Sequence, residues 1–223
     1  MSDTNNGFSQ KGISETMIAI VDYKAGNLTS VRLALEALRI EARITSDPEI
    51  VIQADRVIFP GVGAAGASME EVRRLGLQTA LVEFFESGKP FLGICVGTQI
   101  LLEFSEEDGG TPCLGIIPGR VKRFRPTSHY DKIPQIGWNA VHFLRSHPVL
   151  EGVEDESEFY FVHSYYPDPS HPDHRLGETS YADATFASVV GRDNLIATQF
   201  HPERSGRIGL KLLENFCYWD GVC

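Results

Sequence analysis

A cysteine between two glycines is the first feature of this sequence that could do covalent chemistry. Cys95 lies in FLGICVG, between Gly93 and Gly97, where an apolar run ends and a helical segment begins. A thiol at the start of a helix gains from the helix dipole and from free N–H groups, which stabilise a thiolate. The pattern G-x-C-x-G parallels the elbow G-x-S-x-G, in which glycines let a strained turn present a nucleophile. The alternative is that Cys95 is a small buried hydrophobe whose glycines only allow tight packing.

A histidine and a glutamate near the end of the chain could complete a thiol triad. His201 and Glu203 lie in FHPE, and residues i and i+2 of an extended segment point the same way. Pro202 between them stiffens that geometry. A carboxylate beside a histidine holds one tautomer and stabilises the imidazolium. Cys95, His201 and Glu203 would then act as nucleophile, base and orienter.

An oxyanion formed by such a triad needs hydrogen-bond donors. The backbone N–H of Val96, directly after the thiol, is well placed to be one. The glycine-rich turn PGVG over residues 60–63 could supply the other through Val62, since glycines allow unusual peptide orientations. Taken alone, PGVG is also compatible with a plain β-turn.

The surrounding elements predict how these residues are positioned. Apolar strands over residues 17–21, 56–59 and 91–95 alternate with helical patterns at 28–38, 68–86 and beyond 97, and a last helix carries Ile208, Leu212 and Phe216. This alternation is typical of parallel βαβ units. Residues 109–197 are mostly strand and loop. We expect one α/β domain over residues 16–223, with a flavodoxin-like open, mostly parallel sheet, helices on both faces and a β-rich second half. The carboxyl ends of its strands would meet in one crevice.

The composition limits partners and location. The 223 residues carry a net charge of −10, which makes the chain a poor candidate for binding nucleic acid. The basic stretch 120–125 is either the solvated face of a strand or a local docking patch. We expect a cytoplasmic protein, because there is no secretory signal and no apolar run long enough to span a membrane. Residues 1–15 are polar and are expected to be a disordered leader. The four cysteines are widely spaced, and the motifs predict neither metal nor cofactor.

Taken together, seven segments are similar to the class I glutamine amidotransferase family, including members that serve histidine biosynthesis. They are DYKAGN (22–27), PGVGAAGASMEEVR (60–73), GICVGTQILLEFSEE (93–107), LGIIPGRVKRF (114–124), KIPQIGWN (132–139), FYFVHSYYP (159–167) and FHPERSG (200–206). The resemblance implies that family's fold and its reaction. Cys95 would attack the side-chain amide of L-glutamine, His201 would move protons, and Glu203 would orient His201.

The resemblance also implies further site residues and a partner. Expected glutamine contacts are Gly63, Gln99, Glu107, Ser164 and Tyr165. Expected interface or gating residues are Asn27, Trp138, Tyr160 and Arg204, although Trp138 could equally be a core aromatic. The ammonia would pass to a partner cyclase subunit, a (β/α)₈ barrel, in a heterodimer. Lys24 and Arg204 depart from the common pattern, which leaves details of the interface open. The alternatives are a glutaminase of another pathway and a catalytically silent binding subunit.

Overall fold

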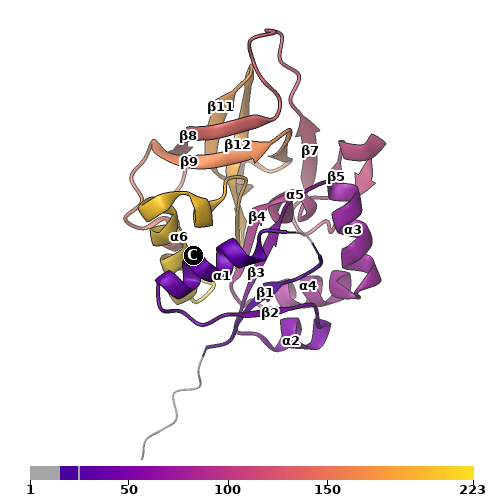
Figure 1. Ribbon diagram of the computed structural model, residues 1–223, viewed down its shortest axis with the longest axis vertical. Helices are drawn as coiled ribbons and strands as arrows, with labels where there is room; N and C mark the ends of the chain where they lie inside the picture. The colour runs from indigo at the N-terminus through magenta and orange to yellow at the C-terminus, as the bar shows by residue number, and fades with distance from the viewer. Residues whose placement is uncertain (1–15, 25) are drawn as a thin grey trace, which may run out of the picture.

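A nine-stranded mixed sheet organises the computed structural model, which describes residues 16–24 and 26–223 (Figure 1). The leader expected over residues 1–15 lies outside the described residues. The strand order is β2-β1-β3-β4-β13-β12-β11-β8-β9. The first five strands in that order pair in parallel: β2 (Arg43–Thr45), β1 (Ile18–Val21), β3 (Arg56–Gly61), β4 (Phe91–Cys95) and β13 (Leu195–Thr198). The remaining four pair antiparallel: β12 (Ala184–Arg192), β11 (Arg175–Tyr181), β8 (Gln135–Phe143) and β9 (Ser157–His163).

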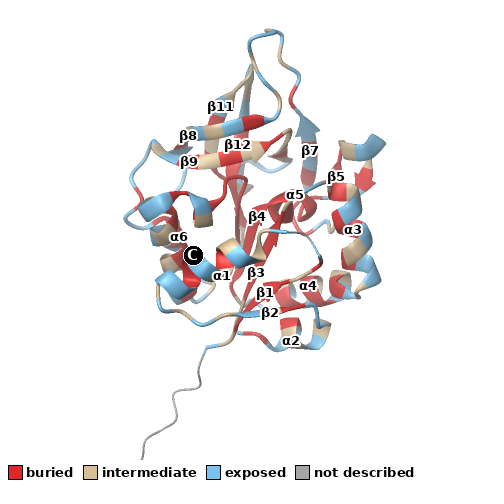
Figure 2. Cartoon of the chain, viewed as in Figure 1, coloured by how far each residue is buried: buried red, intermediate tan, exposed pale blue. Residues whose placement is uncertain are grey.

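The parallel half of the sheet forms the centre of the core. Every residue of β1, β4 and β13 is buried, as Figure 2 shows for the middle of the molecule. Strands that are covered on both faces are continuously apolar instead of alternating. The prediction of buried parallel strands at 17–21 and 91–95 is therefore confirmed.

Helices cover the parallel strands in two groups. α1 (Leu28–Ala37) and α6 (Gly206–Tyr218) contact each other on one side of the strands. α2 (Pro48–Gln53), α3 (Ala65–Arg74) and α4 (Leu77–Glu86) form the other group (Figure 1). The predicted α/β class with helices on both faces is confirmed.

The single helix predicted over residues 68–86 is wrong. Two helices, α3 and α4, occupy this range, because the chain turns at Gly76, whose φ is 71°. A left-handed residue ends a helix, and glycine adopts this conformation without a steric penalty. The helix after Cys95 is also shorter than expected: α5 spans only Val96–Ile100.

A smaller sheet confirms the strand-rich second half. It contains β10 (Tyr165–Pro169), β7 (Gly119–Arg123), β5 (Phe104–Ser105) and β6 (Thr111–Pro112). Short 3-10 turns complete the structure: η1 (Glu107–Gly109), η2 (Pro148–Leu150), η3 (Pro172–His174) and η4 (Pro202–Arg204). No helix of the described part of the chain is long and apolar enough to cross a membrane.

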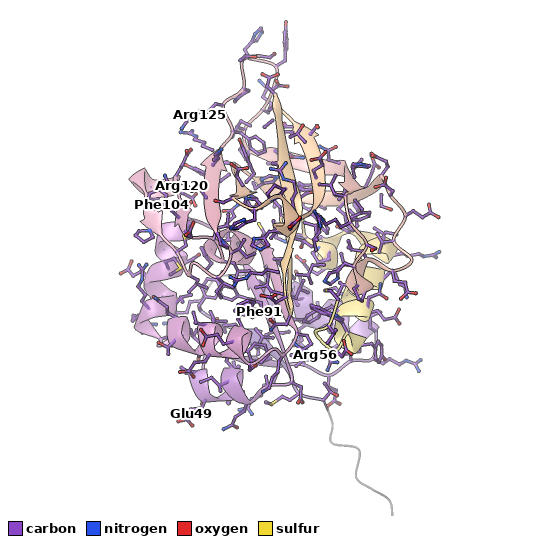
Figure 3. The ribbon with its side chains drawn as sticks, turned by 180° about the vertical axis from the view of Figure 1, so that it is seen from behind. Glu49, Arg56, Phe91, Phe104, Arg120 and Arg125 are labelled. Carbon is purple, nitrogen blue, oxygen red and sulfur yellow. The ribbon has the colours of Figure 1, made fainter. Side chains whose placement is uncertain are left out.

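The basic stretch 120–125 is the outer face of β7 and the residues after it. Its cationic side chains are exposed while Val121 and Phe124 are buried. Arg120 lies over the Phe104 ring at 5.2 Å, and Arg125 pairs with Glu106 at 3.1 Å (Figure 3). Lys122 pairs with Asp168. Local partners therefore account for three of the four cations, in agreement with a solvated strand face.

Candidate active site

The thiol of Cys95 lies at the junction of β4 and α5. Cys95 is the last residue of β4, is 3% exposed, and has φ 55° and ψ −112°. This conformation is strained for any residue with a side chain. A Cβ at Gly97 would lie 1.9 Å from the carbonyl oxygen of Phe59, so only glycine lets α5 start this close to β3. The glycine context thus serves both a strained turn and tight packing.

Three chain segments converge on Cys95, as the sequence predicts. Gly61, at the end of β3, is its register partner, so Val62 of the PGVG turn begins beside the thiol. On the other side of β4, Thr198 of β13 pairs with Ile94. The segment that carries His201 therefore leaves the sheet at the same edge, where parallel strands end.

His201 and Glu203 form a buried ion pair. His201 Nδ1 lies 2.8 Å from Glu203 Oε1, and the two side chains are 1% and 0% exposed. The same carboxylate oxygen accepts a hydrogen bond from Asn27 Nδ2. The expectation of an extended segment is wrong, because the chain enters the 3-10 turn η4 at Pro202. The turn brings the carboxylate back to the imidazole.

The charge state of His201 follows from these neighbours. Burial lowers the pKa of the imidazole, but the Cys95 thiolate and the Glu203 carboxylate outweigh burial and raise the pKa to about 10. Nε2 is buried and has no hydrogen-bond partner among residues 16–24 and 26–223. Since Nδ1 is held by Glu203, Nε2 is the atom that can exchange a proton with a reactant.

A cavity of about 300 Å³ collects most of the predicted residues. It is lined by Val62, Gly63, Cys95, Val96, Gln99, Glu107, Pro134, Val162, His163, Ser164, Tyr165 and His201. These include the two expected oxyanion residues and all five expected glutamine contacts. Glu203 does not line the cavity and reaches it through His201.

A carboxylate and an amide line this cavity. Glu107 Oε2 accepts the N–H of Ala65 at 2.6 Å, at the first residue of α3. Burial raises the pKa of Glu107, Asp108 adds to this, and the Ala65 N–H opposes it. Gln99 Nε2 donates to the carbonyl of Tyr165 at 2.9 Å. The cavity lining therefore includes a carboxylate and a side-chain amide, each of which is held by a backbone group.

Two buried residues of the site were not predicted. Gln199 is fully buried, and its Nε2 donates to Cys95 Sγ at 3.7 Å. His163 lines the cavity and its Nδ1 lies 2.7 Å from the carbonyl oxygen of Tyr165. Burial lowers the pKa of His163 to about 4, so the ring is neutral and Nδ1 carries the proton. His163 lies in the segment 159–167 that the resemblance covers, and Gln199 directly precedes the segment 200–206. Their neighbours in sequence do not distinguish either residue.

The expected interface residues divide into two places. Asn27 contacts the triad, as described above. Trp138 of β8 faces Tyr160 of β9 with a ring-centroid distance of 6.2 Å, and Arg204 lies 5.7 Å from the Tyr160 ring. Trp138 is 54% exposed, so the alternative of a core aromatic is wrong. Ile136, two residues before Trp138 on the same strand, is 64% exposed.

Side chains that could hold a metal gather away from this cavity. Among the described residues, His142, Asp155 and Glu156 form one such group, and all three are exposed. His142 pairs with the two carboxylates at 3.0 and 3.2 Å. The arrangement is explained by these ion pairs.

Comparisons with known proteins identify the family of this chain. The profile of the family "Glutamine amidotransferase class-I" matches residues 19–219. The chain is 48% identical over 207 residues to the imidazole glycerol phosphate synthase subunit HisH of Nitrosococcus oceani, covering 92% of this chain and 98% of that protein. It is 49% identical over 205 residues to the HisH subunit of Nitratidesulfovibrio vulgaris, covering 90% and 95%. A crystal structure of a glutamine amidotransferase is similar in fold, with a TM-score of 0.68, 20% identity, and coverage of 89% and 98%. The chain therefore belongs to the class I glutamine amidotransferase family, among the relatives that are HisH subunits of imidazole glycerol phosphate synthase.

Proposed function

We propose that this chain hydrolyses L-glutamine to glutamate and ammonia with Cys95, His201 and Glu203, and that the ammonia passes to a partner cyclase. One observation carries the reaction: a thiol on a strained turn and a carboxylate-held imidazole line the same small cavity. A nucleophile, a base and an orienter in this order define a thiol triad.

The first half of the reaction forms a thioester. The Cys95 thiolate attacks the side-chain carbonyl carbon of glutamine, and the C–N bond then breaks while the His201 imidazolium gives its proton to the leaving nitrogen. Ammonia leaves. In the second half, His201 takes a proton from water, which attacks the thioester, so that glutamate and the thiolate are released. Each tetrahedral intermediate carries an oxyanion, for which the N–H groups of Val62 and Val96 are the proposed donors.

The cavity provides groups that suit a free amino acid. Glu107 would attract the α-ammonium group, and the backbone of Ser164 and Tyr165 would meet the α-carboxylate. Gly63 would leave room at the mouth, and Gln99 would offer its carbonyl oxygen. A cavity of about 300 Å³ is at the small end of ligand pockets, which favours a single amino acid.

A cyclase partner is proposed from the names of the relatives and from an exposed aromatic surface. The relatives are subunits of imidazole glycerol phosphate synthase. We propose a heterodimer with a (β/α)₈-barrel cyclase, which makes imidazole glycerol phosphate and the aminoimidazole carboxamide ribotide in histidine biosynthesis. The exposed Trp138 and Arg204 side chains lie against the half-buried Tyr160 ring. This combination of residues is enriched at protein interfaces. The backbone of Tyr160 accepts the N–H of His201 at 2.9 Å, so the docking surface adjoins the triad.

The experiment is glutamate release from glutamine by the chain alone, with a cognate cyclase, and with the cyclase plus its ribonucleotide ligand. A Cys95→Ala variant is the control. We expect little activity alone, a large rise with the liganded cyclase, and loss of activity in the variant.

Three other results would contradict parts of the proposal. Full activity that is indifferent to the cyclase would overturn the partner and favour a glutaminase of another pathway. Activity retained by Cys95→Ala would overturn the triad. No glutamate release under any condition would indicate a silent binding subunit.

A further inference from the structure

A chain of buried amides connects the proposed substrate site to the proposed nucleophile. Gln99 Nε2 donates one hydrogen to the carbonyl of Tyr165 and the other to Gln199 Oε1, both at 2.9 Å. Gln199 Nε2 in turn donates to Cys95 Sγ at 3.7 Å. Gln99 is 3% exposed and Gln199 is fully buried.

The direction of every bond in this chain is determined by its first member. A backbone carbonyl such as that of Tyr165 can only accept, so the group of Gln99 facing it must be the NH₂. The same NH₂ then faces Gln199, which must present its oxygen. The Gln199 NH₂ is consequently turned toward the sulfur. If the oxygen and nitrogen of either Gln side chain exchanged places, two donors or two acceptors would face each other in a buried site.

We infer that Gln199 is a further catalytic residue that holds the Cys95 sulfur as a thiolate by donating a hydrogen bond to it, and that Gln99 positions Gln199. The inference rests on the proposed role of Cys95 as the nucleophile. A neutral thiol is a weak acceptor, whereas a hydrogen bond to a charged acceptor is strong. The donor therefore favours the charged sulfur before attack, and again when the thioester breaks and the thiolate departs.

Other titratable groups also surround the sulfur. His201 and Glu203 approach from the segment after β13, His163 and Glu107 line the same cavity, and Tyr23 is buried behind the PGVG strand. A substitution at Gln199 changes none of these groups. The effect of the Gln199 hydrogen bond on the thiolate can therefore be separated from the effects of these charges.

The test is the pH profile of alkylation of Cys95 by iodoacetamide, followed by mass spectrometry of the Cys95 peptide in the full-length chain. Gln199→Met removes the hydrogen bonds of this side chain to Gln99 and Cys95 and nearly keeps its length. Gln199→Leu removes the same hydrogen bonds with a shorter side chain, and neither variant adds a charge beside the sulfur. In both variants the midpoint of the alkylation profile should lie about 1 to 2 pH units above that of the wild type. Below the midpoint, alkylation should then be about 10- to 100-fold slower than in the wild type. Thr198→Val is the matched control. It removes a buried hydrogen bond, from Oγ1 to the Phe200 carbonyl at 2.9 Å, at the neighbouring position.

The outcomes separate this inference from the function on which it rests. A wild-type profile in both folded Gln199 variants would overturn the role of Gln199, as would an equal displacement in Thr198→Val. If Gln199→Met does not fold, the Leu variant decides alone. Loss of glutaminase activity in Cys95→Ala together with unmoved Gln199 profiles would leave the triad intact and exclude only the amide chain. Full activity in Cys95→Ala would remove the basis of both.

Discussion

Two histidines in the cavity differ in charge because their contacts differ. His163 and His201 are both buried and both line the cavity. Burial, with a contribution from the charge of His201, lowers the pKa of His163 to about 4, while Cys95 and Glu203 raise the pKa of His201 to about 10. A neutral imidazole and an imidazolium can therefore lie in one site. Only the second is equipped to protonate a leaving amine.

Glu107→Gln should weaken glutamine binding with a smaller effect on turnover. The variant removes the carboxylate that would meet the substrate ammonium, a charged hydrogen bond of about 1.5–3 kcal/mol, so KM should rise about 10- to 100-fold. Burial raises the pKa of Glu107. As the pH falls through this raised pKa, the carboxyl becomes neutral, and the KM of the wild-type enzyme should increase. Steady-state kinetics over a pH series measure both effects.

The Gln variant is also the control for the pH effect, since it cannot titrate at this position. Its KM should lack the acid-side increase that is due to Glu107. An unchanged KM in Glu107→Gln, or the same acid-side increase in both proteins, would show that this carboxylate does not bind the substrate.

At the scale of elements, the position of the thiol depends on how closely α5 approaches β3. The approach is possible because residue 97 has no side chain: an added Cβ would overlap the Phe59 carbonyl. A backbone atom cannot swing aside as a side chain can. The close contact of this helix start with the sheet therefore depends on one residue.

Gly97→Ala should destabilise the fold severely. Overlap with backbone should cost at least about 3 kcal/mol, which corresponds to a fall in the unfolding temperature of about 6–12 °C. Thermal unfolding followed by circular dichroism measures it. Gly66→Ala is the matched control, because a Cβ there would approach the end of the Asp108 side chain at 2.9 Å, which can rotate. In helix α3 the alanine should be neutral or stabilise by up to about 1 kcal/mol. Equal stability of the two variants would refute this account.

At the scale of the whole molecule, the antiparallel strands extend the sheet beyond the active site. β9 is the edge strand and contacts η4, the turn that carries Glu203. The surface formed by Trp138, Tyr160 and Arg204 therefore lies next to the proposed catalytic residues. A partner seated there would be close to the place where ammonia is released.

Trp138→Ala should weaken binding of the cyclase about 30-fold or more, since a central aromatic anchor contributes about 2 kcal/mol or more. Isothermal titration calorimetry with the cognate cyclase measures the affinity. Tyr218→Ala is the control: Tyr218 is 75% exposed, but it lies near Arg56 and Ile18, at the amino ends of the central strands. If Tyr218→Ala lowers the affinity for the cyclase more than Trp138→Ala does, the interface lies at the opposite end of the sheet.

The local sequence pattern was sufficient to predict several elements of this protein. The buried strands at 17–21 and 91–95 follow from continuous apolar runs, and the nucleophile turn follows from glycines on both sides of Cys95. The break at Gly76 was missed because the apolar spacing of residues 68–86 continues across it, while a single left-handed glycine decides the direction of the chain. Periodicity describes which face is buried and is insensitive to one such residue.

The sequence alone determined the fold class, the family resemblance and the identity of the candidate triad. Only the tertiary structure decided which groups touch those residues. Gln199 and Cys95 are 104 positions apart, and Asn27 and Glu203 are 176 apart. Their contacts depend on the order of strands in the sheet and on the turn at Pro202. Local propensity and periodicity carry information about neighbours within a few residues, whereas these hydrogen bonds form only after distant strands have paired.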